Sequence, residues 1–221
     1  MKTILLSAFK AFGDYPTNPT EIIANQLAGC IFSGFRVSAT TFEANIPTEN
    51  RGKIILEIAR DINATAIVSM GMDSSKRGLC VENTAVNRVL NEKYCLRSQN
   101  NTPVDTSRPY GERLTIDLSR WDIVSFLRTC RSRKIPVMEI SENAGAFCCN
   151  HLIYQVCVEQ LAWHDQLRVP FIFVHTPCSP EAVPNRNSFA EAGKVTITVA
   201  EIMRGLAVLL EHSLIAAPTK T

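Results

Sequence analysis

Two adjacent cysteines, Cys148 and Cys149, lie in the segment SENAGAFCCNHLIYQVC (141–157), between a turn of small residues and an apolar helical pattern. A helix that begins there would present free backbone N–H groups and a positive partial charge to the thiols. Both features lower the pKa of a thiol, and the backbone N–H of Cys149 is a candidate donor to an oxyanion in acyl transfer. Cys149 shares a helical face with Ile153 and Val156, which is more apolar than the face of Cys148, so we expect Cys149 to point toward a site.

The two thiols also have simpler interpretations. Most free cysteines are buried packing residues, and a vicinal pair rarely makes a useful redox couple because its disulfide strains the backbone. The eight cysteines of the chain are scattered, with neither CxxC spacing nor a Cys/His cluster typical of zinc. We therefore expect most of them to be reduced apolar fillers, and we expect no metal.

A histidine and a carboxylate fall where they could join a catalytic thiol. His175 ends the apolar run VPFIFVHTP (169–177), and the loop after ATAIVSMGM (64–72) leads to Glu82. In open α/β sheets, ligands bind outside the carboxyl ends of the strands. A thiol, an imidazole and a carboxylate would then converge on one rim. Each residue alone could equally be structural, as a hydrogen-bonded histidine or an ion-paired carboxylate.

Apolar β-branched runs alternate with amphipathic stretches along the chain. We expect strands at 2–9, 35–44, 64–72, 136–143 and 169–177, a strand or extended segment at 80–90, and helices at 18–29, 48–62, 122–134, 149–165 and 195–212. Such alternation predicts a mostly parallel sheet with helices on both faces. Residues 91–113 are polar and rich in turn formers, and we interpret them as an excursion from a single domain (1–221) that serves as a lid, an arm or an interface element.

The composition is that of a globular α/β unit, with 221 residues, 46% hydrophobic, 20% charged and a net charge of +2. The sequence has no basic stripe, phosphate-binding loop or dinucleotide-binding glycine motif, so we expect neither nucleic acid nor a cofactor. The apolar run at 4–8 is too short for a signal peptide, and no apolar run reaches the roughly 18 residues of a membrane span. We therefore expect no membrane association and a cytoplasmic location.

Four stretches of the chain carry family signatures. SAFKAFGDYPTNPTE (7–21) is similar to the pattern T-G-F-x-P-F-G…N-P-[ST], and GMDSSKRGLCVENTAVN (71–87) to G…E-x-x-A-x-N. SENAGAFCCNHLIYQ (141–155) resembles S-x-x-A-G-x-[YF]-x-C-N-x-x-x-Y, and FIFVHTP (171–177) resembles F-x-H-x-P. These patterns occur in this order in the cysteine-type pyroglutamyl peptidases, also called pyrrolidone-carboxylate peptidases, which the chain resembles over nearly its whole length.

The resemblance implies a fold and a reaction. The fold is a single-domain α/β/α sandwich with a mostly parallel, mixed and twisted central sheet of the phosphorylase/hydrolase-like kind, assembled as a homotetramer. The reaction removes the N-terminal pyroglutamyl residue from peptides through a thioester acyl-enzyme, without a cofactor. The nucleophile corresponds to Cys149, the cysteine immediately before the motif asparagine, whereas Cys148 falls on a variable position. The general base corresponds to His175 and its orienting carboxylate to Glu82.

The resemblance also implies substrate-binding residues. Phe9 and Phe12 match the aromatic residues that flank the five-membered lactam ring of the substrate, although both could instead be core residues. Phe147 could line the same slot or simply pack. Asn18 fits a helix cap better than a substrate contact.

Some stretches depart from the family pattern. The loop MDSSKRG (72–78) replaces glycines and an arginine, and RVLNEKYCLRSQ (88–99) lacks a further family arginine for which neither Arg88 nor Arg97 matches in register. Lys10 and Ala11 also differ from the usual residues. These departures leave two alternative hypotheses, a non-catalytic binding protein on the same fold or a nucleoside phosphorylase-like enzyme.

Overall fold

The computed structural model describes the chain except for residues 47–48, 91–100, 164–167, 184–194 and 215–221. The described residues form a six-stranded sheet in the order β2-β3-β1-β4-β8-β5. Its strands are β1 (Thr3–Phe9), β2 (Ile31–Phe32), β3 (Phe35–Phe42), β4 (Ala66–Met72), β5 (Cys80–Glu82) and β8 (Phe171–Thr176). The central four, β3, β1, β4 and β8, are parallel, and the two outer strands are antiparallel to their neighbours. The sheet is therefore mixed and mostly parallel, as predicted.

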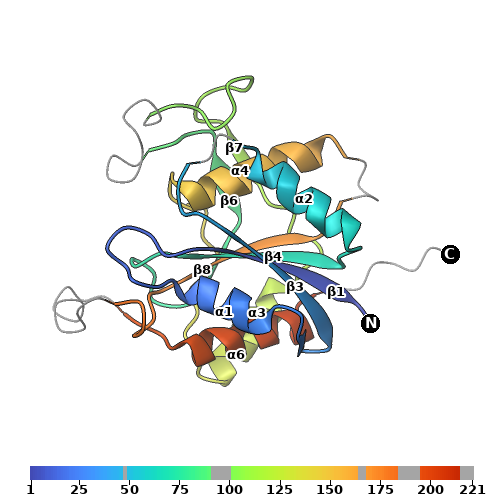
Figure 1. Cartoon of the computed structure of the whole chain (residues 1–221), viewed down its shortest axis with the longest axis vertical. Coiled ribbons are helices and arrows are strands. Elements are labelled where there is room, and N and C mark those ends of the chain that lie inside the picture. The colour runs from blue at the N-terminus through green and yellow to red at the C-terminus, as the bar shows by residue number, and fades with distance from the viewer. Residues whose placement is uncertain (47–48, 91–100, 164–167, 184–194, 215–221) are drawn as a thin grey trace.

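Helices cover both faces of this sheet (Figure 1). Helices α1 (Pro19–Leu27), α3 (Ile123–Ser132) and α6 (Val199–His212) lie on one side, and α2 (Arg51–Asp61) and α4 (Cys148–Leu161) on the other. The small hairpin of β6 (Thr84–Val86) and β7 (Arg113–Thr115) packs beside α4. This arrangement is the predicted α/β/α sandwich, and β5 and β6 together account for the extended segment predicted at 80–90.

Local sequence explains where the helices begin. Asn18 caps α1 by accepting a hydrogen bond from the Thr20 N–H at 3.0 Å, and Pro19 occupies the first turn. Asn50 caps α2 in the same way. Helix α6 begins at Val199 rather than at residue 195, because Thr198 and Glu201 form a capping box there.

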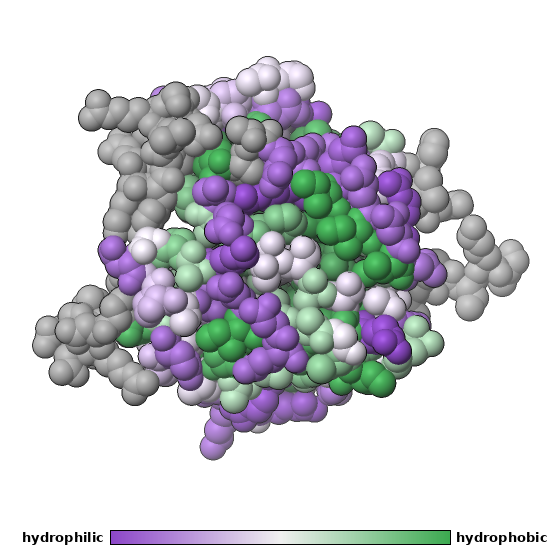
Figure 2. Space-filling view, in the orientation of Figure 1, coloured by the Kyte–Doolittle hydropathy of each residue, from purple (hydrophilic) through white to green (hydrophobic). Residues whose placement is uncertain are grey.

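The two layers of helices bury two separate apolar clusters against the sheet. One cluster lies between the sheet and α1, α3 and α6, and the other between the sheet and α2 and α4. The face shown in Figure 2 carries a band of apolar residues over α2, with hydrophilic residues along the upper edge of the band. None of the helices in the described residues is both long and apolar enough to cross a membrane.

The prediction of a strand at 136–143 is wrong. The segment runs beside β5, but it pairs there only through two isolated bridges, Leu79 with Val137 and Glu82 with Ser141. Because β5 is only three residues long and pairs with β8 along its other edge, it offers few backbone groups to the segment. The segment therefore leads from the sheet edge to α4 without forming a regular strand.

Helix α4 approaches α2 unusually closely at Gly52. A Cβ atom on Gly52 would lie 2.5 Å from the backbone carbon of Gln155 and 2.5 Å from the backbone nitrogen of Val156. The Gln155 side chain crosses the same contact, because its Oε1 accepts a hydrogen bond from the Arg51 N–H at 3.0 Å. The absence of a side chain at Gly52 thus sets the spacing between the two helices.

We predict that Gly52→Ala destabilises the fold by about 1–3 kcal/mol, because the added methyl group forces the backbones of α2 and α4 apart. Urea unfolding followed by circular dichroism measures the change in the free energy of unfolding. The neighbouring exposed Lys53 gives a matched control, since Lys53→Ala should change that free energy by no more than about 0.5 kcal/mol. Equal stability of Gly52→Ala and the parent chain would contradict the close packing.

Candidate active site

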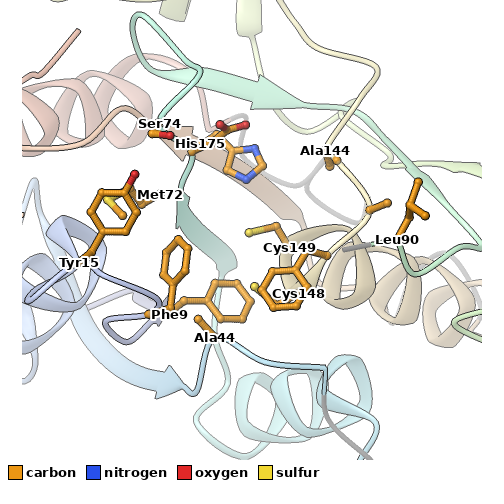
Figure 3. Close-up of a pocket in the computed structure, with 15 residues that line it drawn as sticks. Phe9, Tyr15, Ala44, Met72, Ser74, Leu90, Ala144, Cys148, Cys149 and His175 are labelled. Carbon is orange, nitrogen blue, oxygen red and sulfur yellow. The ribbon is translucent and has the colours of Figure 1, made fainter. Parts of the chain in front are cut away.

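A cavity of about 320 Å³ opens at the carboxyl ends of β1, β4 and β8, next to the start of α4. It is lined from six parts of the chain, by Phe9, Phe12, Tyr15, Ala44, Met72, Asp73, Ser74, Leu90, Ala144, Gly145, Ala146, Phe147, Cys148, Cys149 and His175. Figure 3 shows Cys149 and His175 facing this cavity from α4 and β8. The structure therefore has a cavity at the edge of the sheet where the strand ends predicted a site.

The two adjacent cysteines occupy different environments at the first turn of α4. Cys148 is buried, whereas the Cys149 side chain is partly exposed, and both line the cavity. No side chain in the described part of the chain caps this helix, and its first intrahelical bond runs from the His151 N–H to the Phe147 carbonyl. The preceding N–H groups, including that of Cys149, therefore lie at the positively polarised end of a helix beside the cavity.

The pKa of the Cys149 thiol lies above its ordinary value, contrary to the effect expected from the helix N-terminus alone. A hydrogen bond with the Cys148 thiol is the main cause, followed by burial and by the negative charges of Asp73 and Glu82. A thiol in this environment is protonated at rest. It therefore requires a base to become a nucleophile.

A histidine and a carboxylate are paired beside the thiol. The His175 Nδ1 lies 2.8 Å from the Glu82 Oε1, and both side chains are almost completely buried. Glu82 pairs with Phe173 in the β5–β8 register and so stands diagonally opposite His175 on the same face of the sheet. The ring of Phe173 packs edge-on against the imidazole at a centroid distance of 5.0 Å.

The Glu82 carboxylate is held in its ionised form. Burial raises the pKa of this carboxyl, but the hydrogen bond and charge of His175, together with a hydrogen bond from Lys76, lower it below its ordinary value. The Lys76 Nζ lies 2.7 Å from the same Oε1 atom that His175 approaches. Lys76 lies in the loop MDSSKRG (72–78) that departs from the family pattern, and this ion pair was not predicted from the sequence.

Gly71 lets the thiol and the imidazole approach each other. A Cβ atom on this glycine would lie 2.7 Å from the Cys149 Sγ and 3.4 Å from the His175 Cδ2. Gly71 is directly opposite His175 in the β4–β8 register. The thiol therefore occupies space that any other residue at this position would fill.

The three predicted substrate-binding phenylalanines all line the cavity, although their surroundings differ. Phe9 is buried and belongs to the apolar cluster under α2 and α4, so it is also a core residue. Phe12 and Phe147 are only partly buried. The ring of Phe12 lies 5.6 Å from that of Tyr15, a residue that sequence reasoning missed although it follows Phe12 in the same loop.

An acidic residue, Asp73, also lines the cavity and was missed. Burial raises the pKa of its carboxyl, but the charge of His175, two hydrogen bonds from Ser75 and the charge of Lys76 lower it below its ordinary value. The cavity thus contains a carboxylate in addition to its aromatic walls. The one feature in the sequence that could have indicated this placement is the position of Asp73 directly after a buried strand.

Three asparagines of the matched motifs have structural roles. Asn150 connects α4 to β6 through its side-chain amide. Its Oδ1 accepts a hydrogen bond from the Val86 N–H, and its Nδ2 donates to the carbonyls of Val86 and Arg88. The amide of Asn87 similarly holds the turn at 105–109. Asn18 caps α1, as predicted, and donates to the Lys10 carbonyl at 3.2 Å.

The other described cysteines do not line the cavity. None of the seven described cysteines forms a disulfide with another of them, and burial raises the pKa of Cys130 to about 11 and that of Cys157 to about 12. Arg88 is absent from the cavity lining, and Arg97 lies outside the described residues, as does Cys95. Within the described ranges, no group of three or more His, Cys, Asp or Glu side chains is placed to hold a metal ion.

The fold and the cavity define a class of protein, the α/β proteins that present a thiol, an imidazole and a buried carboxylate at the carboxyl edge of the sheet. Comparison with known sequences narrows this class, because the sequence model of the pyroglutamyl peptidase family matches residues 2–215. The chain belongs to the pyroglutamyl peptidase family.

Individual relatives agree with this assignment. The chain is 29% identical to the pyrrolidone-carboxylate peptidase of Oceanobacillus iheyensis over 86% of this chain and 92% of the relative. It is 26% identical to that of Bacillus mycoides over 96% and 92%. The crystal structure of a pyrrolidone carboxyl peptidase from Fervidobacterium islandicum shares the fold, with a TM-score of 0.77, 19% identity and coverage of 96% and 97%. These relatives favour a peptidase over the phosphorylase-like and non-catalytic hypotheses.

We predict that iodoacetamide labels Cys149 before Cys148, because only Cys149 is appreciably exposed to the cavity. The rate of labelling should keep rising above pH 9, the ordinary pKa of a thiol, because the pKa of Cys149 is raised. Tandem mass spectrometry of the peptide that contains both cysteines measures the label at each position. Faster labelling of Cys148, or a rate that levels off below pH 8, would contradict the structure.

Proposed function

We propose that this chain is a cysteine exopeptidase that hydrolyses the bond after an N-terminal pyroglutamyl residue, with Cys149 as nucleophile, His175 as general base and Glu82 as its orienting carboxylate. The observation that carries the proposal is the meeting of Cys149 and His175 at Gly71, with Glu82 hydrogen-bonded to the far side of the imidazole. In this proposal the three residues act as a nucleophile, a base and an orienting group. These roles define a catalytic triad, whatever the order of the residues along the chain.

The reaction begins when His175 removes the proton from the Cys149 thiol. The sulfur attacks the carbonyl carbon of the pyroglutamyl residue, and the carbonyl oxygen becomes an oxyanion. The backbone N–H of Cys149 at the start of α4 is the proposed donor to this oxyanion. His175 then gives its proton to the departing amine, which leaves a thioester between Cys149 and the pyroglutamyl group.

Water completes the cycle. His175 takes a proton from a water molecule, the resulting hydroxide attacks the thioester, and the thiol of Cys149 leaves with a proton from the imidazolium. Glu82 accepts the Nδ1–H hydrogen bond, so the Nε2 of the neutral imidazole is the atom that accepts a proton. A base is needed because the pKa of the Cys149 thiol lies above its ordinary value.

The cavity walls suit an uncharged, flat ring. Phe9, Phe12 and Phe147 supply apolar surface for the five-membered lactam, and the loop at 144–147, which lines the same cavity, is the proposed source of backbone partners for its N–H and C=O. A free N-terminal glutamate carries a side-chain carboxylate, which the apolar walls leave unpaired and which the carboxylate of Asp73 repels. Such a site therefore rejects it strongly.

The assembly and location of the chain rest on family resemblance. We propose a homotetramer in the cytoplasm that acts on peptides with an N-terminal pyroglutamyl residue, with the excursion at 91–113 as an interface arm, although residues 91–100 of it lie outside the described residues. Light scattering coupled to size-exclusion chromatography measures the mass in solution. A mass of one chain would contradict the tetramer.

We predict that Cys149→Ser lowers the release of a fluorescent amine from a pyroglutamyl-amide by on the order of 10⁴-fold or more, because it removes the attacking sulfur. Cys148→Ser should reduce the rate far less, since Cys148 is buried beside the nucleophile and carries no step of the reaction. Circular dichroism confirms that both variants fold. Loss of activity only in Cys148→Ser would exchange the roles of the two cysteines, and an inactive parent chain would refute the peptidase.

We predict that Phe12→Ala raises the KM for the same substrate by roughly tenfold or more, with a smaller change in kcat, because the lactam loses an apolar wall of its slot. Phe32→Ala is the matched control, since Phe32 packs against the other face of the sheet. Steady-state kinetics measure both constants. An unchanged KM in Phe12→Ala would remove Phe12 from the substrate site.

A further inference from the structure

Lys76 is a buried lysine whose ammonium group lies directly behind the candidate active site. Its side chain is only 10% exposed, and its Nζ lies 2.7 Å from the Glu82 Oε1. The Nζ also lies 3.4 Å from the Ser141 Oγ, on the segment that leads to α4. A buried ammonium is costly unless it is paired, so the position of Lys76 depends on its carboxylate partner.

Lys76 and His175 both contact the Glu82 carboxylate, but through the same one of its two oxygens. Both the Lys76 Nζ and the His175 Nδ1 approach the same oxygen, Oε1, at 2.7 and 2.8 Å. The other oxygen, Oε2, is buried and receives no hydrogen bond from the described residues. The ammonium and the imidazole therefore meet at the same oxygen of Glu82.

We propose that Lys76 is a positioning residue that partly neutralises Glu82 and thereby sets the pH range in which His175 can act as a base. The inference rests on the proposed function, which makes His175 the general base. In a buried site, an uncompensated Glu82 anion would favour the protonated imidazole strongly. The ammonium of Lys76 opposes this effect and keeps the imidazole free to accept a proton from the thiol.

Other ionisable groups also face the pair of Glu82 and His175. Asp73, in the loop after β4, is ionised because its pKa is lowered, and it acts on His175 in the same direction as Glu82. Cys149 at the start of α4 and Cys80 on β5 have raised thiol pKa values, that of Cys80 about 11, so both are neutral near pH 7. Lys76 is thus the cation that counters the two carboxylates.

Lys76 itself remains charged over the relevant range. Burial lowers the pKa of its ammonium, but the hydrogen bond and charge of Glu82 outweigh burial and raise the pKa above its ordinary value. The backbone of Lys76 is fixed as well, because its N–H donates to the Asp73 carbonyl at 3.1 Å. The charge behind Glu82 is therefore permanent near neutral pH.

The test replaces the charge and follows the proton on His175 directly. In Lys76→Met and Lys76→Gln, the midpoint of the His175 titration, measured by NMR of ¹⁵N-histidine-labelled protein, should move to higher pH by about one unit or more. Lys76→Gln retains a hydrogen-bond donor without the charge, which keeps the test valid if Lys76→Met fails to fold. His175→Gln assigns the signal among the four histidines.

Two further variants separate charge from structure. Lys76→Arg keeps the charge and should leave the titration midpoint close to that of the parent chain. Arg77→Gln removes a neighbouring positive charge from an exposed side chain and should also leave it unchanged. An unshifted midpoint in both neutral variants would overturn the proposal, as would a shift in Lys76→Arg equal to that in Lys76→Gln.

The activity profile supplies a second measurement. The acid limb of kcat/KM for the pyroglutamyl-amide should move to higher pH in Lys76→Gln, so that activity at the midpoint of the parent limb falls about fivefold for a shift of one unit. A uniform loss at every pH would indicate a merely structural role and overturn the proposal. An inactive parent chain would refute the peptidase function alone, because the titration of His175 does not require turnover.

Discussion

The hydrogen bond between His175 and Glu82 is the contact around which the candidate site is organised. It forms inside the sheet, between two strands that are antiparallel to each other, and both partners are almost fully buried. A buried carboxylate needs compensating partners, and here these are the imidazole on one side and the Lys76 ammonium on the other. Strand β5, at the edge of the sheet, meets this need because it places Glu82 beside β8.

The proposed nucleophile, Cys149, comes from a different layer, and its placement depends on packing more than on hydrogen bonds. Helix α4 is set against α2 by the contact at Gly52 and against β6 by the amide of Asn150. These contacts fix the first turn of the helix over Gly71, where the thiol meets the sheet. Two glycines in separate elements therefore determine how close the sulfur comes to the imidazole.

Much of this architecture could be predicted from the sequence because it depends on local patterns. The alternation of apolar strands and amphipathic helices indicated the layers, and the Asn18-Pro19 pair indicated the start of α1. The strand at 136–143 was predicted wrongly, since its apolar residues fit an extended pattern but the short β5 offers too few pairing groups. Pairing with a neighbour is a long-range property that a local pattern does not contain.

The charged residues of the site show the same limit more sharply. Lys76 and Arg77 look alike in sequence, as two basic residues in a polar loop, yet one is buried against Glu82 and the other is exposed. Asp73 likewise resembles an ordinary loop residue, although it lines the cavity. Their roles arise only when the loop after β4 folds back over β5, which no spacing within the loop reveals.

Gly71 has a consequence for how such a site is searched experimentally. Alanine scanning identifies functional positions by deleting side-chain atoms and watching what is lost. At Gly71 there is nothing to delete, since the contribution of this residue is the empty volume that the sulfur of Cys149 fills. Only substitutions that add atoms would reveal the role of Gly71. Even the smallest addition, the methyl group of alanine, would overlap the position of the Cys149 sulfur.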